Sequence, residues 1–328
     1  GAPPGGNRRR RRPGQDLRDA PVGHFFSYIV EPGLLSNGAV RTAFLVGTVV
    51  AVTSGVVGVL TVIRGQSFAG HSLADVATTG GAGAFLIGVN QFWGFLIAGV
   101  AGAAVMELIG VQRRRGRDVA TGVVLGAALG AAALFLYLGT QTSSTTGASF
   151  TILFGSMFVI SPDTVPALIA SGVLALAVIA VLSRVLLLTS LSPELAAARG
   201  VPVRAVGIAY LAALAAAVSL SAVVIGAVLS TALLIGPAAT ALRLAKSPGR
   251  AMAAAALIGT VITWLGILLA YDSYYWPPHG HGWPVSFFVV ALVVVAYLLS
   301  YAWRPRRKRR DRAATGAADR KEPACSPA

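Results

Sequence analysis

Long apolar runs, separated by short polar or basic segments, occupy most of this 328-residue chain. About 20 consecutive apolar residues are enough for a helix to cross the hydrocarbon core of a bilayer. The pattern therefore predicts an all-α, polytopic membrane helical bundle of eight or nine spans. The predicted spans are 38–63, 68–89, 92–111, 119–138, 165–188, 251–271 and 285–303, and the run 206–244 is long enough for two more, divided near Gly226 or Ser230.

Two features of the pattern depart from simple spans. The apolar stretch "FTILFGSMFVIS", residues 150–161, is too short to cross, so it predicts a re-entrant or interfacial helix. Gly126 and Gly130 lie four residues apart in the span 119–138, and small residues at such spacing are typical of close helix packing in membranes.

The charge distribution supports a membrane location. Charged residues make up only 12% of the chain, against about 25% in a soluble domain. Lys and Arg outnumber Asp and Glu by 27 to 12, and they cluster between apolar runs or near the two ends, at 8–12, 113–117, 243–250 and 304–312. This is the pattern of the positive-inside rule, with some attraction to anionic membrane lipid, rather than of a nucleic-acid partner. It predicts a cell-membrane, multi-pass protein with a cytoplasmic C-terminus, and leaves the side of the N-terminus open.

A short helix is predicted in the polar connection "SLSPELAAARGVPVRA", residues 190–205. Ser192 suits the N-cap, Pro193 suits the first helical position, and Glu194 complements the helix dipole. Gly200 is placed to end the helix, and Pro202 prevents its continuation. The segment is either an ordinary interfacial loop helix or a docking helix for a cytoplasmic partner.

Several of these motifs, in this order, resemble one family. "IGAVLSTALLIGPAATA" at 225–241, "LFGSMFVIS" at 153–161 and the helix beginning "PELAAARG" at 193 are similar to the transmembrane permeases of ATP-binding-cassette importers for zinc, manganese and iron. The resemblance implies a type II importer-like permease that moves a divalent metal into the cytoplasm. It also implies a separate ATP-binding subunit, an extracytoplasmic metal-binding lipoprotein and a permease homodimer.

On this resemblance, the chain divides into three parts. Residues 1–36 are expected to form a disordered basic arm with an interfacial segment, 37–303 the transmembrane permease domain, and 304–328 a disordered basic cytoplasmic tail. The helix that couples the permease to its ATPase would contain Pro193, Glu194, Ala197, Arg199 and Gly200.

One pair of ionisable residues lies inside a predicted span. In "GHSLADVATTG", residues 70–80, His71 and Asp75 are four residues apart and would share one helix face. Such groups are costly within a membrane and usually mark a pathway or a site. Imidazole and carboxylate together suit a transition metal, so the pair is a candidate gate or pathway ligand. Similar permeases carry the same two residue types in the opposite order. A bond between the two side chains, or a place in an aqueous vestibule, is the alternative.

Other candidate residues lie outside that span. The predicted outer loop "YDSYYWPPHGHGWP", residues 271–284, holds Asp272, His279 and His281, which could chelate metal but more readily form a flexible contact for a substrate-delivering protein. Glu107 lies near a basic loop and is interpreted as an interfacial ion pair rather than a ligand.

Enzyme activity is not expected of the chain. It has no Gly-x4-Gly-Lys-Ser/Thr phosphate loop, so it is not itself the ATPase, and it has no His-Glu-x-x-His metalloprotease motif. No permanently bound cofactor is expected, only the transported ion. An ion-coupled secondary transporter and an importer of a metal chelate remain the alternative functions.

Overall fold

The computed structural model describes residues 38–108, 117–142, 147–155, 157–273 and 282–319, and within these ranges the chain is helical and has no strand. The predicted all-α fold is therefore confirmed. The α-helices are α2 (Gly38–Ile63), α3 (Ser67–Leu86), α4 (Gln91–Leu108), α5 (Arg117–Thr142), α6 (Gly147–Phe154), α7 (Val165–Leu191), α8 (Pro193–Ala198), α9 (Val203–Ile225), α10 (Ser230–Leu244), α11 (Pro248–Asp272) and α12 (Val285–Asp319). Two 3-10 turns, η2 (Met157–Val159) and η3 (Pro162–Thr164), precede α7.

The number of helices that could cross a membrane is lower than predicted. Among the described residues, six are long and apolar enough by length and composition, namely α2, α5, α7, α9, α11 and α12. The predicted eight or nine spans also counted α3, α4 and α10. The apolar parts of α4 and α10 are shorter than 18 residues, and α3 is interrupted by His71, Asp75 and two threonines, which lower its hydropathy.

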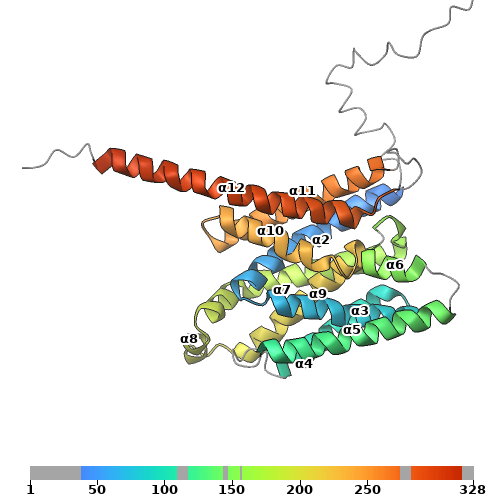
Figure 1. Ribbon diagram of the computed structural model, residues 1–328. Coiled ribbons are helices and arrows are strands. Elements are labelled where there is room, and N and C mark those ends of the chain that lie inside the picture. The colour runs from blue at the N-terminus through green and yellow to red at the C-terminus, as the bar shows by residue number, and fades with distance from the viewer. Residues whose placement is uncertain (1–37, 109–116, 143–146, 156, 274–281, 320–328) are drawn as a thin grey trace, which may run out of the picture.

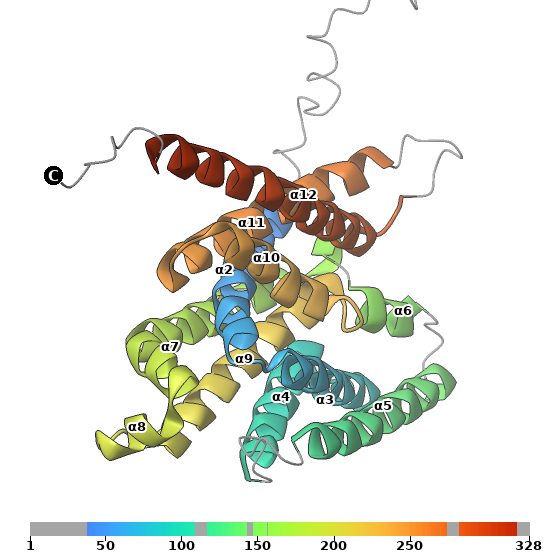
Figure 2. The same ribbon diagram turned by 60° about the vertical axis from the view of Figure 1, so that its left-hand side comes forward.

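Two helices form the inside of the bundle. The most apolar windows of α2 and α9 are 67% and 72% buried, whereas that of α5 is only 17% buried. Tyr210, Leu214 and Val218 of α9 have no exposed surface. Figures 1 and 2 show α3, α4 and α5 on one side of this pair and α10, α11 and α12 on the other.

The bundle has two distinct ends. The short helix α8 lies at one end, here called the α8 end, and α6 lies at the opposite, α6 end (Figure 1). Helix α12 projects past the bundle at the α8 end and continues to Asp319 (Figures 1 and 2). Residues 304–319, the first part of the predicted tail, continue this helix, and their Arg, Lys and Ala residues are good helix formers.

The segment that was predicted to be too short to cross explains how the run 206–244 divides. Helix α9 ends at Ile225 and is capped by Gly226, which has a φ of 101°, and α10 begins at Ser230, so the two predicted positions bound the break. The amides of Ala227 and Val228 donate to the carbonyls of Ile152 and Leu153 at the end of α6. Helix α6 thus satisfies backbone groups that the break between α9 and α10 leaves without helical partners.

Close helix contacts occur at glycines, but not at those the sequence indicated. Gly126 and Gly130 of α5 have open space where a Cβ would lie, so the predicted close packing is wrong within this chain. Gly58 of α2 instead lies against the backbone of α10, where a Cβ would overlap the carbonyl oxygen of Leu234. Gly80 of α3 and Gly94 of α4 approach each other's backbones in the same way.

Replacing Gly58 by Ala is therefore expected to destabilise the bundle. The added methyl group would meet backbone rather than a movable side chain, and overpacking of this kind costs about 1–3 kcal/mol or more. The thermal midpoint of detergent-solubilised protein should fall. Gly126→Ala is the matched control: it adds the same methyl group to a helix where nothing lies within 4 Å, and it should leave the midpoint unchanged. Equal midpoints for both variants would contradict close packing of α2 on α10.

Candidate functional site

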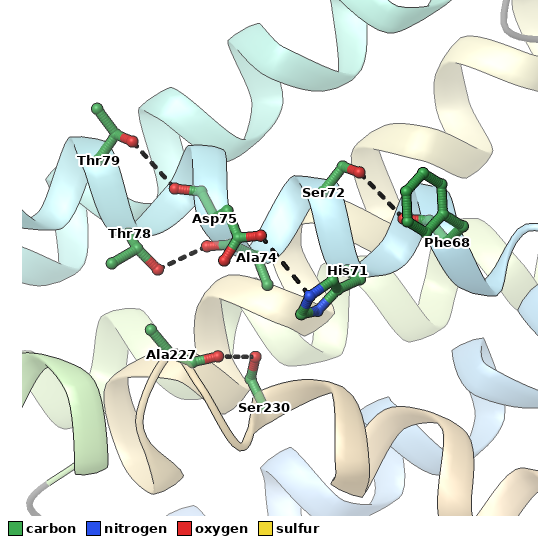
Figure 3. A network of polar contacts seen from close by, with 9 residues as sticks. All are labelled: Phe68, His71, Ser72, Ala74, Asp75, Thr78, Thr79, Ala227 and Ser230. Atoms are coloured by element: carbon green, nitrogen blue, oxygen red, sulfur yellow. Dashed lines mark hydrogen bonds and ion pairs between the residues drawn. The ribbon is translucent and has the colours of Figure 1, made fainter. Parts of the chain in front are cut away.

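His71 and Asp75 lie on one face of α3 and point toward each other, as the spacing predicts (Figure 3). The distance from His71 Nε2 to Asp75 Oδ2 is 3.9 Å. This separation is too long for a hydrogen bond, although it permits an ion pair if the imidazole is protonated. The alternative that the two side chains bond each other therefore takes the form of an ion pair rather than a hydrogen bond.

Asp75 is left with an unsatisfied acceptor. Its side chain is only 11% exposed, and Oδ2 is buried without a hydrogen-bond donor among the described residues. A buried carboxylate oxygen normally has a partner, because an uncompensated charge away from water is costly. The arrangement thus presents an acceptor that a cation would satisfy.

His71, beside this buried acceptor, lies partly at the surface of the chain. Its side chain is 45% exposed, in contrast to that of Asp75. A Cβ atom added at the neighbouring Gly70 would lie 3.2 Å from Leu234 Cδ2, so the first part of α3 contacts α10. Figure 3 shows the turn that holds Ala227 and Ser230 on the side toward which the imidazole projects. The pair is therefore buried at one end and accessible at the other.

Other polar groups of α3 already have partners. Ser72 and Thr78 donate to the carbonyls of Phe68 and Ala74 one turn earlier (Figure 3). Thr79 Oγ1 lies 3.0 Å from the carbonyl oxygen of Asp75 and 2.7 Å from that of Ala128 in α5. The contact of Thr79 with Ala128 holds α3 against α5, and the hydroxyl groups of Ser72, Thr78 and Thr79 donate to backbone carbonyls rather than to the Asp75 carboxylate.

Within the described residues, no further acidic or histidine side chain joins this pair. No group of three or more His, Cys, Asp or Glu residues that could hold a metal occurs within the described ranges. Asp272 is the last residue of α11, and His279 and His281 lie outside the described residues. The amide of Trp283 donates to Ser273 Oγ at 2.9 Å, which holds together the two ends of the connection that carries those histidines. Glu107 lies in α4, where it is half-buried and interacts with other groups.

The predicted short helix is present as α8, from Pro193 to Ala198. Ser192 Oγ accepts from the amide of Leu195 at 3.3 Å, which confirms the predicted N-cap, and Gly200 ends the helix with a φ of 77°. Ala196 is fully buried against the bundle, whereas Glu194, Ala197 and Arg199 are exposed. The apolar side chains Leu191 and Leu195 are 86% and 48% exposed beside it. Helix α8 therefore presents a partly apolar outer surface at the α8 end.

Sequence reasoning missed a pocket at the opposite end. Its volume is about 570 Å³, and its lining includes Asn90, Gln91, Thr151, Ser161 and Thr164. The side-chain amide of Asn90 donates to Thr164 Oγ1 at 2.9 Å, and Asn90 Oδ1 accepts from the amide of Phe92 at 3.0 Å. The lining residues come from the α3–α4 turn, α6, η3 and α9, so no single stretch of sequence could have indicated the pocket.

Comparison with known proteins places this geometry in context. Residues 37–303 match the ABC 3 transport family. The chain is 28% identical over 278 residues to the manganese import system permease protein ScaB of Streptococcus parasanguinis, covering 84% of this chain and 95% of that protein. It is 31% identical over 241 residues to ScaB of Streptococcus gordonii, covering 73% and 85%.

A solved structure shares the fold. PsaBC from Streptococcus pneumoniae, in complex with Fab, aligns with a TM-score of 0.72 and 24% identity, covering 87% of this chain and 98% of the matched chain. The helical order described above is thus the fold of a solved protein structure.

Proposed function

The chain belongs to the ABC 3 transport family, and we propose that it is the permease subunit of an importer that moves a divalent transition metal into the cytoplasm. Manganese is the first candidate, because the similar ScaB proteins are manganese import permeases, with zinc and iron as further candidates. The observation that carries the proposal is the buried, unsatisfied Asp75 Oδ2 beside the half-exposed imidazole of His71.

The ligand chemistry fits a transported ion rather than a resident one. Carboxylate oxygen suits Mn²⁺, and imidazole nitrogen suits Zn²⁺ and Fe²⁺. Two ligands from one chain fall short of the four that a closed structural zinc site requires. An ion in transit must be bound strongly enough to enter and weakly enough to leave. A second copy of the chain would bring the number to four, which supports a homodimer with the pairs facing one another.

The orientation follows from the same assignment. The α8 end is proposed to face the cytoplasm, where the exposed surface of α8 meets a separate ATP-binding subunit and where α12 carries the basic C-terminal segment. The α6 end then faces outward. The pocket there, together with Asp272 and the loop containing His279 and His281, would face an extracytoplasmic metal-binding lipoprotein. ATP binding and hydrolysis in the partner would alternate access to the His71–Asp75 pair from the two sides.

Reconstitution tests the proposal directly. The permease, purified with an ATP-binding subunit and a metal-binding lipoprotein that assemble with it, should accumulate radioactive Mn²⁺ in proteoliposomes only when ATP is supplied at the α8 side. Uptake should be competed by Zn²⁺ or Fe²⁺ more strongly than by Mg²⁺, because the pair supplies a nitrogen ligand. Uptake driven by an ion gradient in the absence of ATP would instead indicate a secondary transporter.

A further inference from the structure

Arg64 lies in the turn between α2 and α3, where three helices meet at the α8 end. The turn from Arg64 to Gln66 leads directly into α3, which carries His71 and Asp75. Its backbone is fixed by bonds from the amide of Arg64 to the carbonyl of Leu60 and from the amide of Gln66 to that of Thr61. A displacement of the Arg64 side chain would therefore be transmitted to the start of α3.

On one side, Arg64 holds the end of α7. Its Nη1 lies 3.1 Å from Thr189 Oγ1, 3.4 Å from the carbonyl oxygen of Leu186 and 3.5 Å from Ser190 Oγ. These acceptors belong to the last turns of α7, directly before Ser192, the N-cap of α8. The guanidinium group thus binds the end of α7, directly before α8 begins.

On the other side, Arg64 stacks on α9. Its guanidinium carbon lies 4.8 Å from the centre of the Tyr210 ring, within the range of a cation–π contact. The hydroxyl of the fully buried Tyr210 donates to Thr61 Oγ1 at 2.9 Å, so Tyr210 connects α9 to α2. Helix α9 is the helix that the chain enters after α8, so Arg64 touches both helices that flank α8.

We infer that Arg64 is a positioning residue that transmits movement of α8 to the His71–Asp75 pair on α3. The inference rests on the proposed function, in which α8 docks on an ATPase. Movement of α8 displaces the end of α7 and the start of α9 together. Arg64 contacts both and is covalently continuous with α3, so the displacement reaches the pair through the turn between α2 and α3.

Arginine is suited to this position and lysine is not. A planar guanidinium group donates to several acceptors while it stacks on a ring, whereas an ammonium group is a point charge on a flexible stem. Arg64→Lys should therefore retain the charge but loosen the connection, and Arg64→Gln should remove both the charge and the stacking.

The test is the amount of metal transported per ATP hydrolysed by the reconstituted complex. Arg64→Gln should lower this ratio about 5- to 100-fold, the range of a typical coupling free energy between sites, while the ATPase subunit stays bound and hydrolyses ATP. Arg64→Lys should fall between Arg64→Gln and the wild type. Arg184→Gln is the matched control, because Arg184 is an exposed arginine on α7 that makes no part of this contact, and its ratio should equal that of the wild type.

The outcomes separate this inference from the proposed function. If wild-type complex shows no ATP-dependent uptake, the proposed function fails; if wild type transports and Arg64→Gln has the wild-type ratio, only the inference on Arg64 fails. Should Arg64→Gln not accumulate in the membrane, Thr189→Val decides, because it removes one acceptor and keeps the side-chain shape. A lowered ratio in Thr189→Val supports the inference, and a wild-type ratio overturns it.

Discussion

His71→Ala and Asp75→Ala are each expected to abolish metal uptake while leaving the protein in the membrane. Removing either side chain deletes one of the two proposed ligands, and within the described residues no third His, Cys, Asp or Glu joins the pair. Even changes outside the ligand shell of a metal site cost about 10- to 100-fold in affinity or activity, so uptake should fall at least this far. Initial rates of Mn²⁺ uptake, normalised to the amount of permease, measure the effect.

Asp75→Asn distinguishes a transport role from a structural one. It removes the charge and keeps the shape of the side chain, so it relieves a buried carboxylate oxygen that has no donor. Uptake should be lost, whereas the thermal midpoint should be equal or higher, because burying a neutral amide costs less than burying a carboxylate oxygen that accepts no hydrogen bond. Glu107→Gln, the same chemical change on α4, serves as the matched control and should transport normally. A lower midpoint with unchanged uptake in Asp75→Asn would make the pair structural.

The exchanged double variant, His71→Asp with Asp75→His, probes the order of the two ligands. It restores the order that similar permeases carry, and it keeps both ligand types on the same face of α3. Measurable uptake is therefore expected where both single alanine variants have none. An inactive double variant would show that the ligand order in this chain is matched to the burial of Asp75 and the exposure of His71.

The positions of the helices were predictable because the length of an apolar run can be read from the local sequence alone. The run 38–63 coincides with α2, and the capping residues Ser192 and Gly200 delimit α8 as their chemistry requires. The number of spans was not predictable in the same way, because hydropathy varies continuously along the chain. Helix α3 contains His71, Asp75 and threonines in place of apolar residues, so its hydropathy is too low for it to count as a span. Both predicted positions bound the break, since Gly226 caps α9 and Ser230 begins α10, and the residues between them bond to α6, a segment far away in the chain.

The contacts that place the candidate site were not predictable. The i, i+4 spacing of His71 and Asp75 showed that they share a face, but not that one side chain is buried and the other half-exposed. Arg64 directly follows the predicted span 38–63, and the sequence pattern did not indicate its contacts. Its partners Thr189 and Tyr210 are more than a hundred residues away in the chain. Close packing at Gly58 depends on the path of α10, so the spacing of glycines along one helix indicated Gly126 and Gly130 instead.

Helix α8 is where a single substitution should disconnect the permease from its energy source. Proline at position 197 removes a backbone donor from a helix of only six residues and clashes with the carbonyl four positions earlier, at a cost of about 3 kcal/mol or more. Ala197 is exposed, while the neighbouring Ala196 is buried and its carbonyl accepts from the amide of Val201. The damage should therefore fall on the outer surface of α8 and spare the bundle.

Ala197→Pro should accordingly insert and fold with the α8 turn disrupted, yet fail to retain the ATPase subunit on purification and fail to transport. Ala197→Ser is the matched control, because it changes the exposed side chain but keeps the backbone donor, and it should behave as wild type. The contrast with Arg64→Gln locates each defect: the proline variant loses the partner, whereas the Arg64 variant keeps the partner and loses transport per ATP. Normal retention of the ATPase and normal metal-dependent hydrolysis in Ala197→Pro would show that the ATPase docks elsewhere.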